Sequence, residues 1–208
     1  MANEAELGLR ERKKLGTRKA LSDAALRLVF ERGLENVRRE DIAALAGVSV
    51  RTFNNYFASK YEALAYRQIE RLQRTVAALR ERPADEPLWT AITAAVLEPL
   101  IADGGEGTAP SPAQMSEVRK LTAVPQVRAV VSESAFGDEL IAVIARRTGT
   151  DAERDLYPRL VAATVEGAWR AAAEVYLRAD PPVSILSLLR KALHEVAEGL
   201  PDPSSQQD

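Results

Sequence analysis

The chain has 208 residues, of which 46% are hydrophobic and 28% are charged, and its net charge is −2, a composition typical of a globular protein. It has no cysteine and only one histidine, His194, which leaves almost no material for a thiolate or histidine metal site or for a Ser-His-Asp triad. Since it also lacks an apolar run of about 18 residues and a secretory signal, we expect a cytoplasmic protein with no metal, no cofactor and no enzyme activity.

Hydrophobic residues recur at helical spacing along the whole chain, whereas alternating, strand-like runs are nearly absent. In the first predicted helix, Leu21, Ala25 and Leu28 share one apolar face, and Gly33 is a typical C-terminal cap. Ser59 and Glu62 form the pattern of a capping box at the start of a long helix. The predicted helices cover residues 17–33, 39–46, 49–56, 59–82, 87–101, 114–122, 125–147, 152–179 and 182–198.

The chain is expected to have a basic head and a larger, acidic body. Residues 1–60 contain 12 Lys or Arg and 8 Asp or Glu, a net charge of +4, whereas the rest contains 16 and 22, a net charge of −6. This asymmetry favours a head that binds a polyanion. The predicted parts are a flexible basic arm at 1–14, a polyanion-binding domain at 15–60, a connecting helix at 61–82, a large helical domain at 83–200 and a disordered tail at 201–208.

The most informative segment is the pair of short helices at 39–46 and 49–56. The turn between them contains Gly47, which can adopt a positive φ, and Ser49 is a good N-cap for the second helix, so the layout is that of a helix-turn-helix. The outer face of the second helix carries Val50, Arg51, Thr52, Asn54 and Asn55. Arginine and asparagine can bind guanine and adenine bidentately in the major groove, and Val50 and the Thr52 methyl group could touch thymine. A DNA-reading helix is therefore predicted, with an ordinary solvated face as the alternative.

These residues carry a family resemblance. Residues 16–64 resemble the N-terminal domain of the tetracycline-repressor (TetR) family of bacterial regulators. The matching residues are Thr17-Arg18, Gly33, Asp41-Ile42-Ala43, Ala46-Gly47-Val48-Ser49, Thr52-Phe53, Tyr56-Phe57 and Ser59-Lys60. The resemblance implies an all-α fold of about nine helices, with an N-terminal three-helix helix-turn-helix head and a larger C-terminal helical domain for ligand binding and dimerisation.

The resemblance also implies which residues touch DNA. Thr17, Tyr56 and Lys60 would contact phosphates, which suits a lysine at a helix start, although Tyr56 could instead be a core aromatic. Arg38 departs from the family, which often has a capping threonine there, and the extra arginines could add backbone contacts. The cations of the arm either touch the duplex or form a solubilising tail. The predicted DNA-binding residues are Thr17, Arg18, Arg38, Arg39, Ser49, Val50, Arg51, Thr52, Asn54, Asn55, Tyr56 and Lys60.

The body of the protein offers weaker signals, and it is somewhat similar to family members that sense acyl chains or acyl-coenzyme A. Glu166 and Arg170 form either an intrahelical ion pair or a polar anchor in a pocket, and the aromatic residues could equally be ordinary core. The candidate ligand-binding residues are Trp89, Met115, Arg119, Phe136, Glu166, Trp169 and Arg170. The resemblance implies a homodimer through the last two long helices, with Leu160, Gly167, Leu186, Leu189 and Leu193 at the interface.

Together, these features predict a sequence-specific transcriptional regulator, a repressor that a small-molecule ligand releases from its operator. The expected partners are double-stranded operator DNA, a second copy of the chain and an apolar or acyl-CoA-like ligand. A ligand-independent regulator or an activator on the same fold remains an alternative. A non-catalytic helical ligand-binding protein, which belongs to a different functional class, also remains an alternative.

Overall fold

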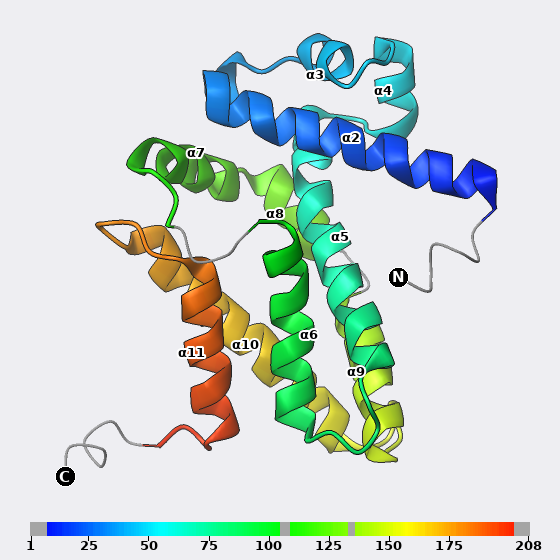
Figure 1. Cartoon of the computed structure of the whole chain (residues 1–208), viewed down its shortest axis with the longest axis vertical. Helices are drawn as coiled ribbons and strands as arrows, with labels where there is room; N and C mark the ends of the chain where they lie inside the picture. The colour runs from blue at the N-terminus through cyan, green and yellow to red at the C-terminus, as the bar shows by residue number, and fades with distance from the viewer. Residues whose placement is uncertain (1–7, 105–108, 133–135, 202–208) are drawn as a thin grey trace. The chain divides into compact units, whose positions relative to one another are not determined.

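All the regular elements in the part of the chain that the structure describes are helices, as expected (Figure 1). The computed structural model describes residues 8–104, 109–132 and 136–201. Residues 202–208 of the predicted tail and the first seven residues of the predicted arm lie outside this range. In chain order the elements are α2 (Leu9–Arg32), η1 (Leu34–Asn36, a 3-10 helix), α3 (Arg39–Leu45), α4 (Val50–Tyr56), α5 (Lys60–Glu81), α6 (Leu88–Ala102), α7 (Pro112–Ala123), α8 (Pro125–Ser132), α9 (Phe136–Thr148), α10 (Leu156–Arg178) and α11 (Ile185–Ala197).

The chain forms two compact units whose boundaries differ from the predicted domains. The N-terminal unit consists of Met1–Glu70 and Ser116–Glu133, and the C-terminal unit consists of Arg71–Met115 and Ser134–Asp208. The chain therefore passes from one unit to the other within α5 and again within α7. A segment that the sequence analysis assigned to the body belongs to the head.

Three predicted elements differ in their ends. The first helix begins at Leu9, so residues 9–14 of the predicted arm are helical. The single helix predicted at 125–147 is instead α8 and α9, and the residues between them lie outside the described range. The helix α10 begins at Leu156 rather than near 152, because the Asp151 carboxylate accepts the N–H groups of Glu153 and Arg154 and forms a turn.

The N-terminal unit is built on one apolar core. The buried face of α2 contacts side chains of α3, α4 and α5, and Leu21, Ile42 and Phe53 are fully buried there. Gly47 has a φ of +70°, and the Ser49 side chain accepts the N–H of Thr52, so the turn and cap predicted between α3 and α4 are confirmed. These local features set α4 on the head with one side packed and the other exposed.

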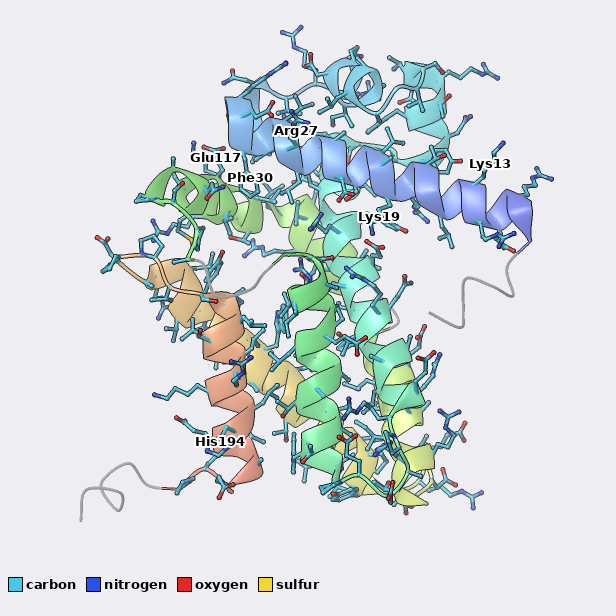
Figure 2. The ribbon with its side chains drawn as sticks, in the orientation of Figure 1. Lys13, Lys19, Arg27, Phe30, Glu117 and His194 are labelled. Atoms are coloured by element: carbon cyan, nitrogen blue, oxygen red, sulfur yellow. The ribbon has the colours of Figure 1, made fainter. Side chains whose placement is uncertain are left out.

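Both backbone polar groups of Leu34, its N–H and its carbonyl, are hydrogen-bonded in the turn after α2. Gly33 ends α2 with a φ of +83°, and the Leu34 N–H then donates to the Glu117 carboxylate at 2.7 Å. The Lys60 ammonium donates to the carbonyl oxygens of Leu34 at 2.9 Å and of Val37 at 3.1 Å. Glu117 lies on α7 beside the C-terminal part of α2 (Figure 2). We call the hydrogen bond between Glu117 and Leu34 the latch.

The C-terminal unit is a helical bundle made of the second part of α5 and of α6, α9, α10 and α11. The helix α10 packs against both α9 and α11, and α11 also packs against α6. Its buried residues form two clusters, and Trp169 packs against both. Arg147 caps the connection after α5 by donating to the carbonyl oxygens of Arg82, Pro83 and Glu86. No helix in the described ranges is long and apolar enough to cross a membrane.

The latch predicts a pH-dependent stability. Hydrogen bonds from Lys120 and from the Leu34 N–H lower the pKa of Glu117. A lowered pKa contributes stability above the ordinary glutamate pKa of about 4.3, and this contribution is lost as the pH falls through the folded-state value. We therefore expect Glu117→Gln to lower the Tm at about pH 7, and its difference from the wild type to shrink below about pH 4.3. Thermal unfolding followed by circular dichroism across this range measures it, and a pH-independent difference would contradict a charged latch.

Candidate nucleic-acid interface

The helix α4 presents a polar face to solvent, as the sequence predicts. Arg51, Asn54 and Asn55 are exposed, whereas Phe53 and Phe57 on the other side are completely buried. A seven-residue helix anchored by two buried rings cannot turn its outer side inward without opening the core. The arrangement is suited to insertion of the exposed side into a groove.

The predicted base-reading residues are not equivalent. Val50 is partly buried against the core, and the Thr52 hydroxyl is hydrogen-bonded to the Ser49 hydroxyl at 2.8 Å, so these two offer mainly methyl groups. The Asn54 side-chain oxygen accepts from Arg39 at 3.3 Å, which orients the amide and leaves one lone pair of this oxygen and the amide N–H groups for a base. Among the described residues, Arg51 has no such partner and is the best placed to bind a guanine.

The Lys60 ammonium has a structural role that the sequence analysis missed. Its hydrogen bonds to the carbonyls of Leu34 and Val37 use two of its three N–H groups, and it lies 5.3 Å from the centre of the Tyr61 ring. The third N–H is left for a phosphate, so that contact stays a prediction. Tyr56 is partly buried against the core, a position compatible with either of its two predicted roles.

Thr17 and Arg18 lie in the interior of a helix, not at its start. The Thr17 hydroxyl donates to the carbonyl of Lys13 at 2.9 Å. The Arg18 guanidinium lies 5.3 Å from the centre of the Phe57 ring and 4.8 Å from that of Tyr66, and its Nε is buried without a partner among the described residues. Arg18 thus joins α2 to α4 and α5 through cation–π contacts, and we correct its predicted role from DNA contact to anchor.

The Tyr66 ring takes part in the same group of contacts, with Arg18 and with Phe57. Burial raises the pKa of the Tyr66 phenol, the nearby Glu70 carboxylate raises it further, and the Arg18 guanidinium opposes both. Its ring also packs edge-on against Phe57, with 5.7 Å between ring centres. The contact of Arg18 with two rings is therefore part of the head's core.

At the start of α3, where Arg38 stands in place of a capping threonine, one half of a capping box is present. Arg38 cannot accept a hydrogen bond from the helix, but the Asp41 carboxylate accepts the N–H of Arg38 at 3.0 Å. At the start of α5, the Ser59 hydroxyl accepts the N–H of Glu62, while the Glu62 carboxylate accepts the N–H of Ala58. Arg38 and Arg39 remain exposed, as a backbone contact requires.

The candidate ligand residues of the body are dispersed. Met115 is fully buried, while Trp89, Phe136 and Trp169 are partly buried against the core of the C-terminal unit. Arg119 is exposed and belongs to the N-terminal unit. Glu166 and Arg170 are also exposed, and no ion pair joins them within the described residues. Exposure does not match the enclosed polar anchor expected of this pair.

The predicted dimer residues fall into two groups. Leu186, Leu189 and Leu193 on α11 are at most 5% exposed in their own chain, so they are core residues and their assignment to the interface was wrong. Leu160 on α10, by contrast, is 56% exposed, and a Cβ on Gly167 would have nothing within 4 Å. We define the α10 stripe as the apolar and small residues on its outer side: Leu156, Leu160, Ala163, Gly167, Ala171 and Val175.

Comparison with known proteins matches both parts of the chain. Residues 21–65 match the model of the bacterial regulatory proteins of the tetR family, and residues 86–201 match the model of the MftR C-terminal domain. The HTH-type transcriptional regulator TcmR of Streptomyces glaucescens is 35% identical over 188 residues, covering 87% of this chain and 82% of TcmR. MftR of Mycobacterium tuberculosis is 28% identical over 203 residues, covering 96% and 98%.

A solved structure has a similar fold. The FadR repressor of Thermus thermophilus, in complex with lauroyl-CoA, superimposes with a TM-score of 0.56 at 19% identity, covering 92% of this chain and 98% of FadR. At this identity the likeness concerns the fold.

Lys60 should affect both stability and phosphate binding. Lys60→Met keeps the apolar stem but removes the donor of two backbone carbonyls, and a buried acceptor left unpaired costs about 1–3 kcal/mol. We expect a lower Tm and, if the third N–H meets a phosphate, a dependence of log K on log salt that is weaker by about 0.9. Thermal unfolding and salt titrations of binding measure the two effects separately. An unchanged Tm would disprove the capping role.

Proposed function

We propose that this chain, which belongs to the tetR family of bacterial regulatory proteins, is a repressor that leaves its operator when its C-terminal unit binds a small molecule. The observation that supports this most directly is the exposed polar face of α4 opposite the buried Phe53 and Phe57. Since its operator would be chromosomal DNA, we place the protein in the cytoplasm.

Sequence readout is assigned to the exposed side chains of α4. Arg51 and Asn55 reach base edges in the major groove, and Asn54, oriented by its hydrogen bond from Arg39, joins them. Arg38, Arg39 and Tyr56 contact the backbone, which sets the register but carries little sequence information. This division gives base-reading and phosphate-binding residues different experimental signatures.

The effector is proposed to be an apolar molecule of the acyl-chain or acyl-CoA class. The FadR of T. thermophilus, whose fold is similar, binds lauroyl-CoA. In the C-terminal unit, Trp89, Phe136 and Trp169 lie partly buried at the edge of the core, where an apolar chain can replace contacts between side chains. Trp169 packs against both apolar clusters, so a ligand beside it would contact each of them.

Transmission from ligand to operator is proposed to run through α7. This helix begins in the C-terminal unit, and after Met115 it continues in the N-terminal unit, where Glu117 accepts the Leu34 N–H. Leu34 lies in the turn that leads from α2 into the helix-turn-helix. A ligand that favours another position of α7 therefore favours another setting of this turn, and its differential affinity shifts the equilibrium away from the DNA-bound form.

Two recognition helices must reach successive major grooves, so the repressor is proposed to act as a dimer. The α10 stripe is suited to this role, since its side chains recur every three or four residues and Leu160 is exposed although apolar. Burial of such a stripe by a second copy would remove it from water. The leucines of α11 contribute indirectly, by holding α11 against the rest of its own unit.

The proposal is tested with a duplex that the purified protein recovers from the genomic DNA of its host. Arg51→Ala should cost about 1–3 kcal/mol on this duplex and leave affinity for random duplex unchanged. Fluorescence anisotropy measures both affinities. Equal affinity for the recovered and the random duplex would contradict sequence readout by α4.

Lauroyl-CoA, added first among acyl thioesters of different length, should lower the affinity of the wild type for the recovered duplex. If no acyl compound lowered the affinity for the recovered duplex, the proposed class of effector would be wrong.

Dimerisation is tested on the α10 stripe. Leu160→Arg places a charge in the stripe, and an unpaired charge is costly to bury. We expect a monomer by light scattering and at least about tenfold weaker binding to a duplex with two half-sites. Leu200→Arg is the matched control, because Leu200 is also an exposed leucine, at 67%, but lies beyond α11. Identical behaviour of the two variants would exclude the stripe as the interface.

A further inference from the structure

The N-terminal end of α2 extends the helix well before the first residue that packs into the core. The helix begins at Leu9, and Leu21, 12 residues or about 18 Å further along, is the first fully buried side chain among those that the structure describes. Residues 9–19 contain six Lys or Arg and one acid, Glu11. We call residues 9–16 the extension. In Figure 1 the N-terminal turns of α2 run on past α4.

The cations of the extension lie on distinct faces of α2. Positions separated by 7 or 11 residues share one side of a helix, so Arg10 and Lys14 lie in line with Leu21 and Ala25. Leu21 and Ala25 form the side that packs against α3, α4 and α5. Arg12 and Lys19, also seven residues apart, lie on the opposite side. The face of α2 that is apolar inside the head is therefore basic beyond it.

This basic face points to the side where a duplex would lie. Phe53 of α4 is buried in the same core as Leu21, and Arg51 and Asn54 are exposed on the far side of α4. The direction from the packed face of α2 through α4 thus leads to the groove-facing surface. The contact of Arg18 with Phe57 and Tyr66 fixes the helix axially and in rotation, so the extension has a defined position on the head.

The charges of the extension are not used within the described part of the protein. Arg10, Arg12, Lys13 and Lys14 are exposed, and none has a carboxylate within 4 Å there, whereas Arg27 pairs with Glu31 further along the same helix. Figure 2 shows Lys13 and Lys19 on different sides of α2. Unpaired cations on one face of a fixed helix are suited to a polyanion.

We propose that Arg10 and Lys14 of the extension bind backbone phosphates of the operator beyond the base pairs that α4 reads, and so lengthen the contacted site. This inference rests on the proposed function and adds a second contact surface to it. The sequence pattern before Thr17 indicated an arm, but a helix gives its cations a face, and only one face can reach the duplex.

The test compares two double variants of equal charge, R10Q/K14Q and R12Q/K19Q. Glutamine is nearly as good a helix former as Lys and Arg, so both helices should persist, which circular dichroism checks. Each phosphate contact contributes about 0.9 to the slope of log K against log salt. R10Q/K14Q should therefore lower the slope by about 1.8 per protomer, or about 3.6 for the dimer, so that, from about 50 to about 200 mM salt, the affinity of the dimer falls about 150-fold less than that of the wild type. R12Q/K19Q should keep the wild-type slope.

Footprinting of the DNA backbone with hydroxyl radicals provides a second readout. The wild type and R12Q/K19Q should protect positions flanking the α4 contacts that R10Q/K14Q leaves exposed. Equal losses of slope in both variants would show a general charge effect and overturn the inference, as would no loss in either. If the wild type itself fails to bind duplex, the proposed function fails, whereas wild-type binding with an unaltered R10Q/K14Q slope refutes only the role of the extension.

Discussion

The geometry of the head depends on the contacts of one ring. Phe57, directly after α4, lies 5.9 Å from the Phe53 ring, 5.7 Å from the Tyr66 ring and 5.3 Å from the Arg18 guanidinium. These partners come from α4, α5 and α2, so one completely buried side chain joins three helices. Aromatic pairs of this kind contribute about 0.5–1.5 kcal/mol each beyond burial, and their geometry is directional. The ring therefore fixes both the outward side of α4 and the rotation of α2.

Local signals explain what the sequence could predict. A glycine in a turn, a serine at a helix start and two phenylalanines four residues apart specify the pair α3 and α4 without information from the rest of the chain. Gly47, Ser49, Phe53 and Phe57 all occupy the expected positions. The start of α2 was missed because apolar periodicity, on which the prediction relied, begins only at Leu21. Lysine and arginine are good helix formers, so the helix continues where no core demands it.

Contacts between distant residues explain what the sequence could not predict. Glu117 accepts the N–H of Leu34 across 83 positions, and nothing near either residue marks the pair. Lys60 carried a family expectation of phosphate contact, yet the backbone carbonyls of the Leu34 turn occupy most of its ammonium. The leucines of α11 outnumber those that a helix buried on one side needs, and the prediction therefore assigned them to a dimer interface. In the structure, two apolar clusters of their own unit contain them. In each case a nonlocal partner decided the role.

The charges of α2 connect the stability of the helix to the binding of its partner. Arg10 and Lys14 are four residues apart, and like charges at this spacing destabilise a helix by about 0.2–0.5 kcal/mol. A duplex that neutralises them removes this repulsion, so occupancy of the operator and helicity of the extension favour each other. Residues 61–208 have a net charge of −6, and this charge opposes any approach of the body to the same polyanion. Attraction is thus confined to the head, where the Phe57 ring has already fixed the faces that meet DNA.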